Sequence, residues 1–321
     1  MAAAVSAKKT VDAEGHAREA EKCLKTSWTK WKPDFDGAAH AYEKAGLCYR
    51  HAKSLEKSKA MYMKAAECHT QCKALFHAAK AYEQAALLLK DMKEYDEAVH
   101  LITRAASMFR EHGTGDTAAI SLEKAAKMME TINAKSAVDL YLSAAEIAEN
   151  EDRIRQSVDS VSKAARLSVR TRDFDKALQL LEKARNMYDV VENLGYVYKM
   201  VVVTVLVHLH RGDFVAASKV CNAAMRYDGY AMDESSSLLE QLLEAYDQQD
   251  QESASKILFL PYFTYLDNDY VKLARTLRVP GGEVGGGGGR QELTTEGATA
   301  MGGQDEAVED DEEDEYAGGL C

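Results

Sequence analysis

The stretch Asp36-Gly-Ala-Ala-His-Ala-Tyr-Glu-Lys-Ala45 spaces Ala38, Tyr42 and Ala45 four and three residues apart. These spacings place the three side chains on one face of a helix, with a ring between two small residues that let a neighbouring helix come close. The pattern returns every 20 residues along much of the chain. Its closing alanines are Ala45, Ala65, Ala85, Ala105, Ala125, Ala145 and Ala165, after which the register slips by one residue to Ala184.

Each 20-residue unit has room for one helix and one short turn. We expect helices of about 14 to 16 residues, judged from ordinary helix and loop lengths. Short connections make neighbouring helices antiparallel, and hairpins must stack because no single hairpin buries its own apolar stripe. Turn residues such as Arg211-Gly-Asp-Phe214 agree, since Gly ends one helix and Asp caps the next. The sequence predicts an all-α, TPR-like (tetratricopeptide-like) superhelical solenoid of antiparallel helical hairpins.

The repeat does not run to the end of the chain. We expect the solenoid in residues 1–227 and a C-terminal helical cap or bundle in residues 228–280, where the strongly helical segment Leu238 to Tyr246 lies. Residues 281–321 contain five consecutive glycines and a run of seven acidic residues. Such a composition predicts a disordered, Gly-rich acidic tail.

Charge is distributed unevenly along the chain. Residues 1–227 contain 35 Lys and Arg against 30 Asp and Glu, whereas residues 228–280 contain 4 against 10. The tail contains 12 acidic residues against one Arg and supplies nearly all of the net charge of -12. An isoelectric point near 5.3 argues against a nucleic-acid partner. We expect a molecule that is positive along most of its length and negative at its far end.

Membrane spans and export signals are not apparent in the sequence. The longest apolar stretch, Val197 to Leu209, is too short to span a bilayer, so we expect a buried helix there. The N-terminus lacks the apolar segment of a secretory signal. Six Cys residues without an export signal fit a reducing compartment. These features predict a cytosolic chain whose thiols are free.

No catalytic motif stands out. The sequence contains neither a phosphate-binding P-loop nor a His-Glu-x-x-His zinc motif, which favours a protein that is not an enzyme and binds no cofactor or metal. The remaining metal candidate is formed by Cys48, His51, Cys68 and Cys72, whose helical spacings could converge on zinc. Buried Cys also serves as a small apolar residue in helical cores, and we favour that reading.

Two aromatic residues and two basic clusters are candidate contact sites. Trp28 and Trp31 either pack beneath the first hairpin or anchor the chain at a membrane surface, where Lys30 and Lys32 would meet anionic lipid. A second group, Lys163, Arg166 and Arg170, forms a helical stripe. This stripe is either a solvated face or a surface that grips an acidic helical partner.

Several long segments together resemble one family. They are Trp28-Thr-Lys-Trp-Lys-Pro-Asp-Phe-Asp36, Ala74-Leu-Phe-His-Ala-Ala-Lys-Ala-Tyr-Glu-Gln-Ala85, Val205-Leu-Val-His-Leu-His-Arg211, Leu242-Leu-Glu-Ala-Tyr-Asp-Gln-Gln-Asp250 and the ending Asp314-Glu-Tyr-Ala-Gly-Gly-Leu-Cys321. The chain resembles the soluble NSF attachment protein (SNAP) family, in its gamma form, over nearly its whole length. The resemblance implies a helical-hairpin sheet with a C-terminal bundle.

The resemblance also implies a function in vesicle-mediated transport, including protein transport between the endoplasmic reticulum and the Golgi. Proteins of this family are non-enzymatic adaptors on the cytosolic face of membranes. Several copies, monomeric when free, surround one four-helix SNARE bundle of the syntaxin type. They recruit the hexameric ATPase NSF, which takes the bundle apart.

Carried over residue by residue, the resemblance assigns the membrane-attachment loop to Trp28 and Trp31. It assigns ATPase docking to Glu244 and Asp247, with Gln248 where the family has a further acidic residue. The family's penultimate Leu matches Leu320, which follows the acidic block ending in Asp314 and Glu315. The SNARE-facing residues do not map in this way, so Lys163, Arg166 and Arg170 are inferred from their charge alone.

Two other functions remain open at this point. One is a TPR-type co-chaperone or scaffold that clamps acidic peptide termini, which would need Lys and Asn side chains in one groove. The other is a zinc-dependent or thiol enzyme built around Cys48, Cys68 and Cys72.

Overall fold

The computed structural model describes residues 2–26 and 31–281, and every regular element in these ranges is a helix. The all-α prediction is confirmed. The predicted tail lies outside the described residues except for Gly281. The elements are α1 (Ala2–Leu24), α2 (Phe35–His51), α3 (Leu55–Gln71), α4 (Leu75–Asp91), α5 (Tyr95–His112), α6 (Gly115–Met129), α7 (Ala134–Asn150), α8 (Ile154–Arg170), α9 (Phe174–Val190), α10 (Leu194–His210), α11 (Phe214–Ala224), η1 (Tyr230–Met232), α12 (Glu234–Asp247), α13 (Gln251–Leu258), α14 (Pro261–Thr264) and α15 (Asn268–Arg275).

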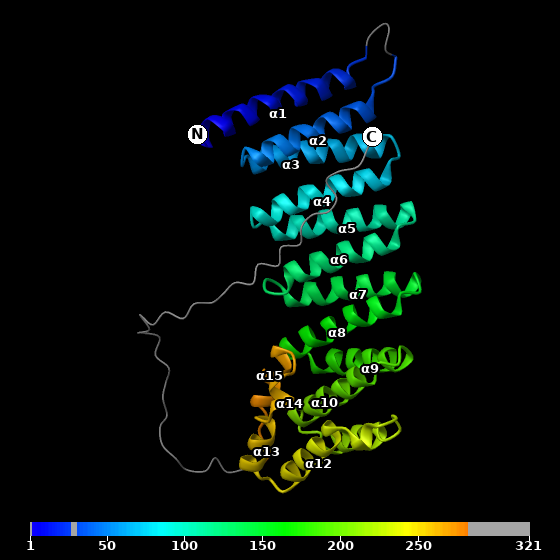
Figure 1. Ribbon diagram of the computed structural model, residues 1–321, viewed down its shortest axis with the longest axis vertical. Helices are drawn as coiled ribbons and strands as arrows, with labels where there is room; N and C mark the ends of the chain where they lie inside the picture. The colour runs from blue at the N-terminus through cyan, green and yellow to red at the C-terminus, as the bar shows by residue number, and fades with distance from the viewer. Residues whose placement is uncertain (1, 27–30, 282–321) are drawn as a thin grey trace, which may run out of the picture. The chain divides into compact units, whose positions relative to one another are not determined.

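Helices α1 to α11 stack in chain order, each packed against the one before it (Figure 1). Successive helices run antiparallel, so even-numbered and odd-numbered helices form two layers. The last helices leave this order: α12 packs on α10 and α11, and α15 returns to lie against α8 and α10. The superhelical solenoid predicted from the repeat is therefore present. The division at residue 227 stays a prediction, because α10 and α12 pack together across it.

The turns between the stacked helices are tighter than the sequence suggested. Most helices from α2 to α10 have 17 residues and are joined by only three. The chain reverses so quickly because one residue in every turn from α2 to α11, except the turn between α6 and α7, takes the left-handed conformation, which lets the next backbone N–H groups bond to the helix end. In the first such turn, Lys53 N donates to Arg50 O and Ser54 N to Tyr49 O, both at 2.9 Å.

The left-handed residues recur with the repeat. The left-handed conformation strains the backbone of any residue other than glycine. Even so, three of these positions are lysine and only two are glycine. They are Lys53, Lys73, Lys93, Gly113, Asp152, Arg172, Glu192 and Gly212. Successive members of this set are 20 residues apart, with one exception. The separation between Gly113 and Asp152 is one residue less than two full repeats.

That shortfall locates the register slip, and our placement of it after Ala165 is wrong. Helix α6 begins at Gly115 and α7 at Ala134, so the slip lies between these two helices. The buried triplet of α7 is Ala137, Tyr141 and Ala144. Alanine still stands at 145 and 165 because α7 and α8 each contain two adjacent buried alanines, and the 20-residue count picks the second.

The triplets form the core of the stack. Residues at the fourth, eighth and eleventh positions of successive helices are buried against the neighbouring helices. The segment Val197 to Leu209 lies within α10, and most of its side chains are inaccessible to solvent, as expected for a buried helix. No helix within residues 2–26 and 31–281 is long and apolar enough to cross a membrane.

Candidate functional site

The even-numbered helices α2 to α10 present one continuous surface, which we call the even-helix face. Lys44 on α2, Lys124 on α6 and Lys163 on α8 each occupy the tenth position of their helix, and Lys127 lies three residues further along α6. None of the four makes an ion pair with a described residue. Our sequence reasoning selected only Lys163, although the 20-residue interval that revealed the core also relates Lys44 to Lys124.

Exposed apolar side chains lie between these cations. Leu47 on α2, Leu87 on α4 and Ile120 on α6 are 46%, 41% and 44% exposed. Leu47 and Leu87 occupy the same position on alternate helices. Large apolar side chains at repeated, half-exposed positions between cations are typical of a surface that contacts a partner.

Two carboxylates of this face are bonded within the fold. Glu83 accepts a hydrogen bond from Ser121 Oγ, and Glu123 accepts from Gln156 Nε2 at 3.1 Å and from Ser160 Oγ at 3.0 Å. Each glutamate thus connects its own helix to the next even-numbered helix. These two carboxylates therefore help to hold the layer together, while Lys124 beside Glu123 makes no ion pair with a described residue.

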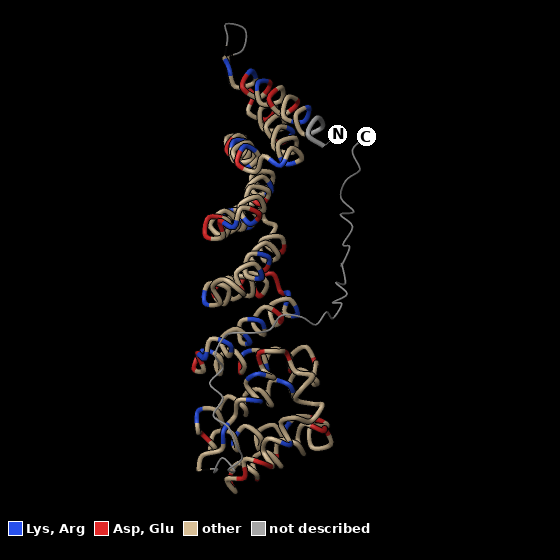
Figure 2. Tube along the Cα trace, turned by 90° about the vertical axis from the view of Figure 1, so that its left-hand side faces the viewer, with Lys and Arg blue, Asp and Glu red and all other residues tan. Residues whose placement is uncertain are grey.

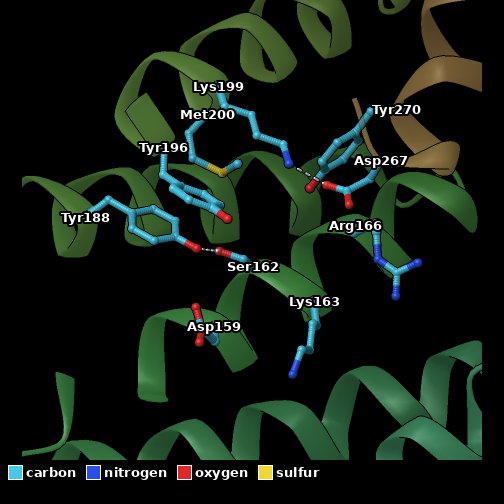
Figure 3. Close-up of a pocket in the computed structure, with 10 residues that line it drawn as sticks. All are labelled: Asp159, Ser162, Lys163, Arg166, Tyr188, Tyr196, Lys199, Met200, Asp267 and Tyr270. Atoms are coloured by element: carbon cyan, nitrogen blue, oxygen red, sulfur yellow. Dashed lines mark hydrogen bonds and ion pairs between the residues drawn. The ribbon is translucent and has the colours of Figure 1, made fainter. Parts of the chain in front are cut away.

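A cleft of about 170 Å³ opens at the C-terminal end of the even-helix face, between α8, α9, α10 and the start of α15 (Figure 3). Tyr188 and Tyr196 stack with their ring centroids 4.8 Å apart, and Ser162 Oγ donates to the Tyr188 hydroxyl at 3.0 Å. Lys163 on α8 and Lys199 on α10 also line the cleft, and Lys199 Nζ lies 5.5 Å from the ring centroid of Tyr196. The cleft therefore combines stacked rings with two lysines and with the carboxylates of Asp159 and Asp267.

Burial changes the acid–base behaviour of this cleft. It raises the pKa of Tyr188 to about 12, so the phenol stays protonated at neutral pH. It also raises the pKa of Asp159, while the Lys163 charge acts in the opposite direction. No residue here is a base positioned against a nucleophile, as catalysis would need.

The predicted stripe of Lys163, Arg166 and Arg170 does not act as one unit. Lys163 Nζ lies 5.6 Å from the ring centroid of Tyr141 and has no carboxylate partner among the described residues. Arg166 is mostly buried and pairs with Glu130 at 2.8 Å and Asp269 at 3.1 Å. Arg170 donates to the backbone oxygen of Glu130.

Arg166 and its partners form an internal network. Burial alone would raise the pKa of Glu130, but hydrogen bonds from Tyr141 and Arg166 outweigh it and lower that pKa. Asp269, at the start of α15, is 6% exposed. Arg166 thus joins the end of α6 and the last helix to α8, and Lys163 is the member of the stripe whose charge is free for a partner.

Within the described residues, basic and acidic side chains are not separated along the stack as expected (Figure 2), although residues 228–280 keep their excess of 10 acidic over 4 basic residues. Figure 2 shows Lys and Arg interspersed with Asp and Glu on most helices. The reason is structural, since alternate helices are tied by ion pairs such as Lys176 with Asp139 at 3.0 Å and Lys183 with Glu149 at 2.7 Å. Unpaired charge remains on several surfaces, among them the even-helix face and the outer side of α12.

The outer side of α12 carries an acidic ridge formed by Glu240, Glu244 and Asp247. The three residues are exposed, share one face at spacings of four and three, and make no ion pair with a described residue. Gln248 Nε2 donates to Glu244 Oε1 at 3.0 Å. Glu240 was missed from the sequence, although the same spacing would have found it. Asp314, Glu315 and Leu320 lie outside the described residues.

The loop between α1 and α2 is only partly described. Trp28 and Lys30 lie outside the described residues, while Trp31 and Lys32 are both exposed. The Trp31 side chain is 89% exposed, so this indole does not pack beneath the first hairpin. An indole held this far into solvent is typical of a contact residue.

The cysteines do not converge. Cys68 is buried, Cys48 is half-buried and Cys72 is exposed. Within the described ranges, no three His, Cys, Asp or Glu residues are placed to hold a metal ion. Burial raises the pKa of Cys68 and of Cys72, which opposes thiolate formation.

Comparison with known proteins places the chain in a family. The family described as "Soluble NSF attachment protein, SNAP" matches residues 11–262. Proteins named gamma-soluble NSF attachment protein from Dictyostelium discoideum and Arabidopsis thaliana are each 26% identical, the first over 87% of this chain and 86% of that protein, the second over 83% and 91%. The solved apo form of RapI is 13% identical with a TM-score of 0.41, and covers 74% of this chain and 73% of that one. The chain belongs to the soluble NSF attachment protein family.

Proposed function

We propose that this chain is a non-enzymatic adaptor of the gamma form, which binds assembled four-helix SNARE bundles and recruits the ATPase NSF to disassemble them. The observation that carries the proposal is the family match over residues 11–262. Two surfaces that present charged side chains without ion pairs to described residues support it, and they are opposite in charge. The even-helix face would bind the bundle, and the acidic ridge of α12 would bind the ATPase.

An elongated face suits a rod-shaped partner. Lys44, Lys124 and Lys163 stand on three even-numbered helices spread along the stack, with apolar side chains between them. A bundle with acidic residues on its outside could meet these cations at several levels at once. Such contacts are exposed and ionic, so salt should weaken them.

The charge of the even-helix face can be tested by reversal. We expect the double variant Lys124→Glu, Lys163→Glu to bind a purified four-helix SNARE bundle at least about tenfold more weakly at low salt, because each position loses an attraction and gains a repulsion. Isothermal titration or fluorescence anisotropy would measure the affinity. The loss should shrink as salt is raised towards about 0.5 M.

A matched control uses lysines of the odd-numbered helices. Lys64→Glu on α3 with Lys135→Glu on α7 changes the net charge by the same amount, and both lysines are exposed. This variant should bind as the unmodified chain does. If both double variants lose the same affinity for the bundle, the loss reflects the net charge of the chain. The even-helix face would then not be the binding surface.

The loop between α1 and α2, in which Trp31 is exposed, is the proposed membrane contact. We expect the double variant Trp28→Ala, Trp31→Ala to lose most of its binding to vesicles containing anionic lipid, since indoles favour the interface and neighbouring lysines add electrostatic attraction. Vesicle co-sedimentation would measure binding. Thermal unfolding should not change, because Trp31 is 89% exposed. A large drop in the melting temperature would instead assign the indoles to packing.

Reconstitution tests the whole proposal. Purified SNARE bundle, NSF and ATP should give faster bundle disassembly with this chain than without it. The same assay separates the adaptor from a TPR-type clamp for acidic peptide termini, since a clamp would bind such peptides and leave disassembly unchanged.

A further inference from the structure

The turn that leads into α15 brings carboxylates onto the even-helix face. Asp267 Oδ2 lies 2.8 Å from Lys199 Nζ, and Asp269 Oδ2 lies 3.1 Å from Arg166 Nη1. Figure 3 shows Asp267 and Lys199 pointing towards each other at the edge of the cleft. Two cations of this face are thus already bound by acidic side chains from elsewhere in the same chain.

The two carboxylates differ in how firmly they are held. Asp269 is 6% exposed, and the next residue, Tyr270, is 1% exposed and packs in the core. Asp267 is different, because its side chain is 47% exposed and that of Lys199 is 25% exposed. An ion pair this accessible contributes little to stability and can exchange its partners. Asp269 is therefore a fixed part of the fold, whereas Asp267 is replaceable.

We propose that Asp267 is an internal competitor for the acidic partner of the even-helix face, and that it lowers the affinity for that partner by occupying Lys199. The inference rests on the proposed function, since it takes the partner to be acidic. Lys163 lines the same cleft and makes no ion pair with a described residue, although its charge acts on Asp159 one turn earlier in α8, so it meets the partner before Lys199 does. Lys199 joins when a carboxylate of the partner takes the place of Asp267.

The test removes the competing charge. Asn begins helices as well as Asp does, so Asp267→Asn should preserve the start of α15. We expect this variant to bind the purified four-helix SNARE bundle about two- to fivefold more tightly at low salt, the range expected for one exposed ion pair. The gain should vanish near 0.5 M salt, where exposed charges are screened. Asp267→Ser serves as a second variant if Asn perturbs α15.

Two further variants make the result specific. Asp175→Asn removes the same charge from an exposed pair with Arg211, 2.7 Å long, on helix α9 outside the cleft, and should leave the affinity unchanged. In a Lys199→Gln background, Asp267→Asn should gain clearly less than in the unmodified chain, because the cation being competed for is absent. An equal gain in affinity in both backgrounds would show that Asp267 only repels the acidic partner and does not compete for Lys199. That result would overturn the proposal.

The failures can be told apart. If the unmodified chain binds the bundle and Asp267→Asn binds no more tightly, the internal competitor is refuted while the adaptor function stands. If the unmodified chain binds no bundle at any salt concentration, both the adaptor function and the competitor are refuted.

Discussion

Replacing Arg166 with Met is expected to lower the free energy of unfolding by about 3 to 5 kcal/mol, which is the cost of leaving a buried ion pair without one partner. The guanidinium bonds Glu130 and Asp269, whose side chains are 17% and 6% exposed. Both carboxylates would lose their cation in a site where water replaces it poorly. Since α15 is joined to α8 through Asp269, we expect this helix to loosen first.

The loss can be measured in two ways. Hydrogen exchange should rise in α15 and in the end of α6, and the melting temperature should fall by about 6 to 12 °C for a unit of this size. Adding Glu130→Gln and Asp269→Asn to Arg166→Met should recover part of the stability, because the stranded charges are removed. Unchanged stability in Arg166→Met would show that the network contributes nothing.

Lys163→Met is the matched control. It removes a cation from the same helix and the same cleft, but this cation has no carboxylate partner among the described residues. We expect it to change stability by less than about 1 kcal/mol and to weaken bundle binding. Opposite outcomes for the two variants would show that Arg166 stabilises the fold and that Lys163 binds the partner.

This division of roles marks the limit of what spacing can predict. The interval of 20 residues fixed the class of fold, because only one helix and one turn fit each unit. It also placed Lys163, Arg166 and Arg170 on one helical stripe. The stripe could not reveal that Asp269, 103 residues after Arg166, folds back onto α8. A contact between residues so far apart depends on the path of the chain, which local periodicity does not encode.

The register slip shows a second limit. Adjacent alanines such as Ala144 and Ala145 are both buried, so counting alanines continues through the slip without a break. The tyrosine of the triplet could have located it, since Tyr141 stands 59 residues after Tyr82, one short of three repeats. The turns were misjudged for a different reason. Left-handed lysines are costly in isolation, so the sequence favoured longer turns, whereas backbone hydrogen bonds within each such turn offset that cost.

The acidic ridge of α12 was predicted through Glu244 and Asp247, and the structure adds Glu240. Reversing all three in Glu240→Lys, Glu244→Lys, Asp247→Lys is expected to weaken recruitment of NSF by about 100-fold, on the order of 1 kcal/mol for each reversed charge. The helix itself should remain intact, because lysines in its last turns interact more favourably with the helix dipole than acidic residues do. Binding to the SNARE bundle should not change.

A triple variant on the odd-numbered helices tests whether location matters. Glu111→Lys, Glu146→Lys and Asp189→Lys alter the net charge identically, and these residues are exposed and unpaired among the described side chains. Pull-down of NSF on immobilised bundle would compare the two variants at equal adaptor occupancy. If the control loses as much recruitment as the ridge variant, the ATPase responds to total charge. If the ridge variant keeps full recruitment, the acidic docking surface must lie outside α12.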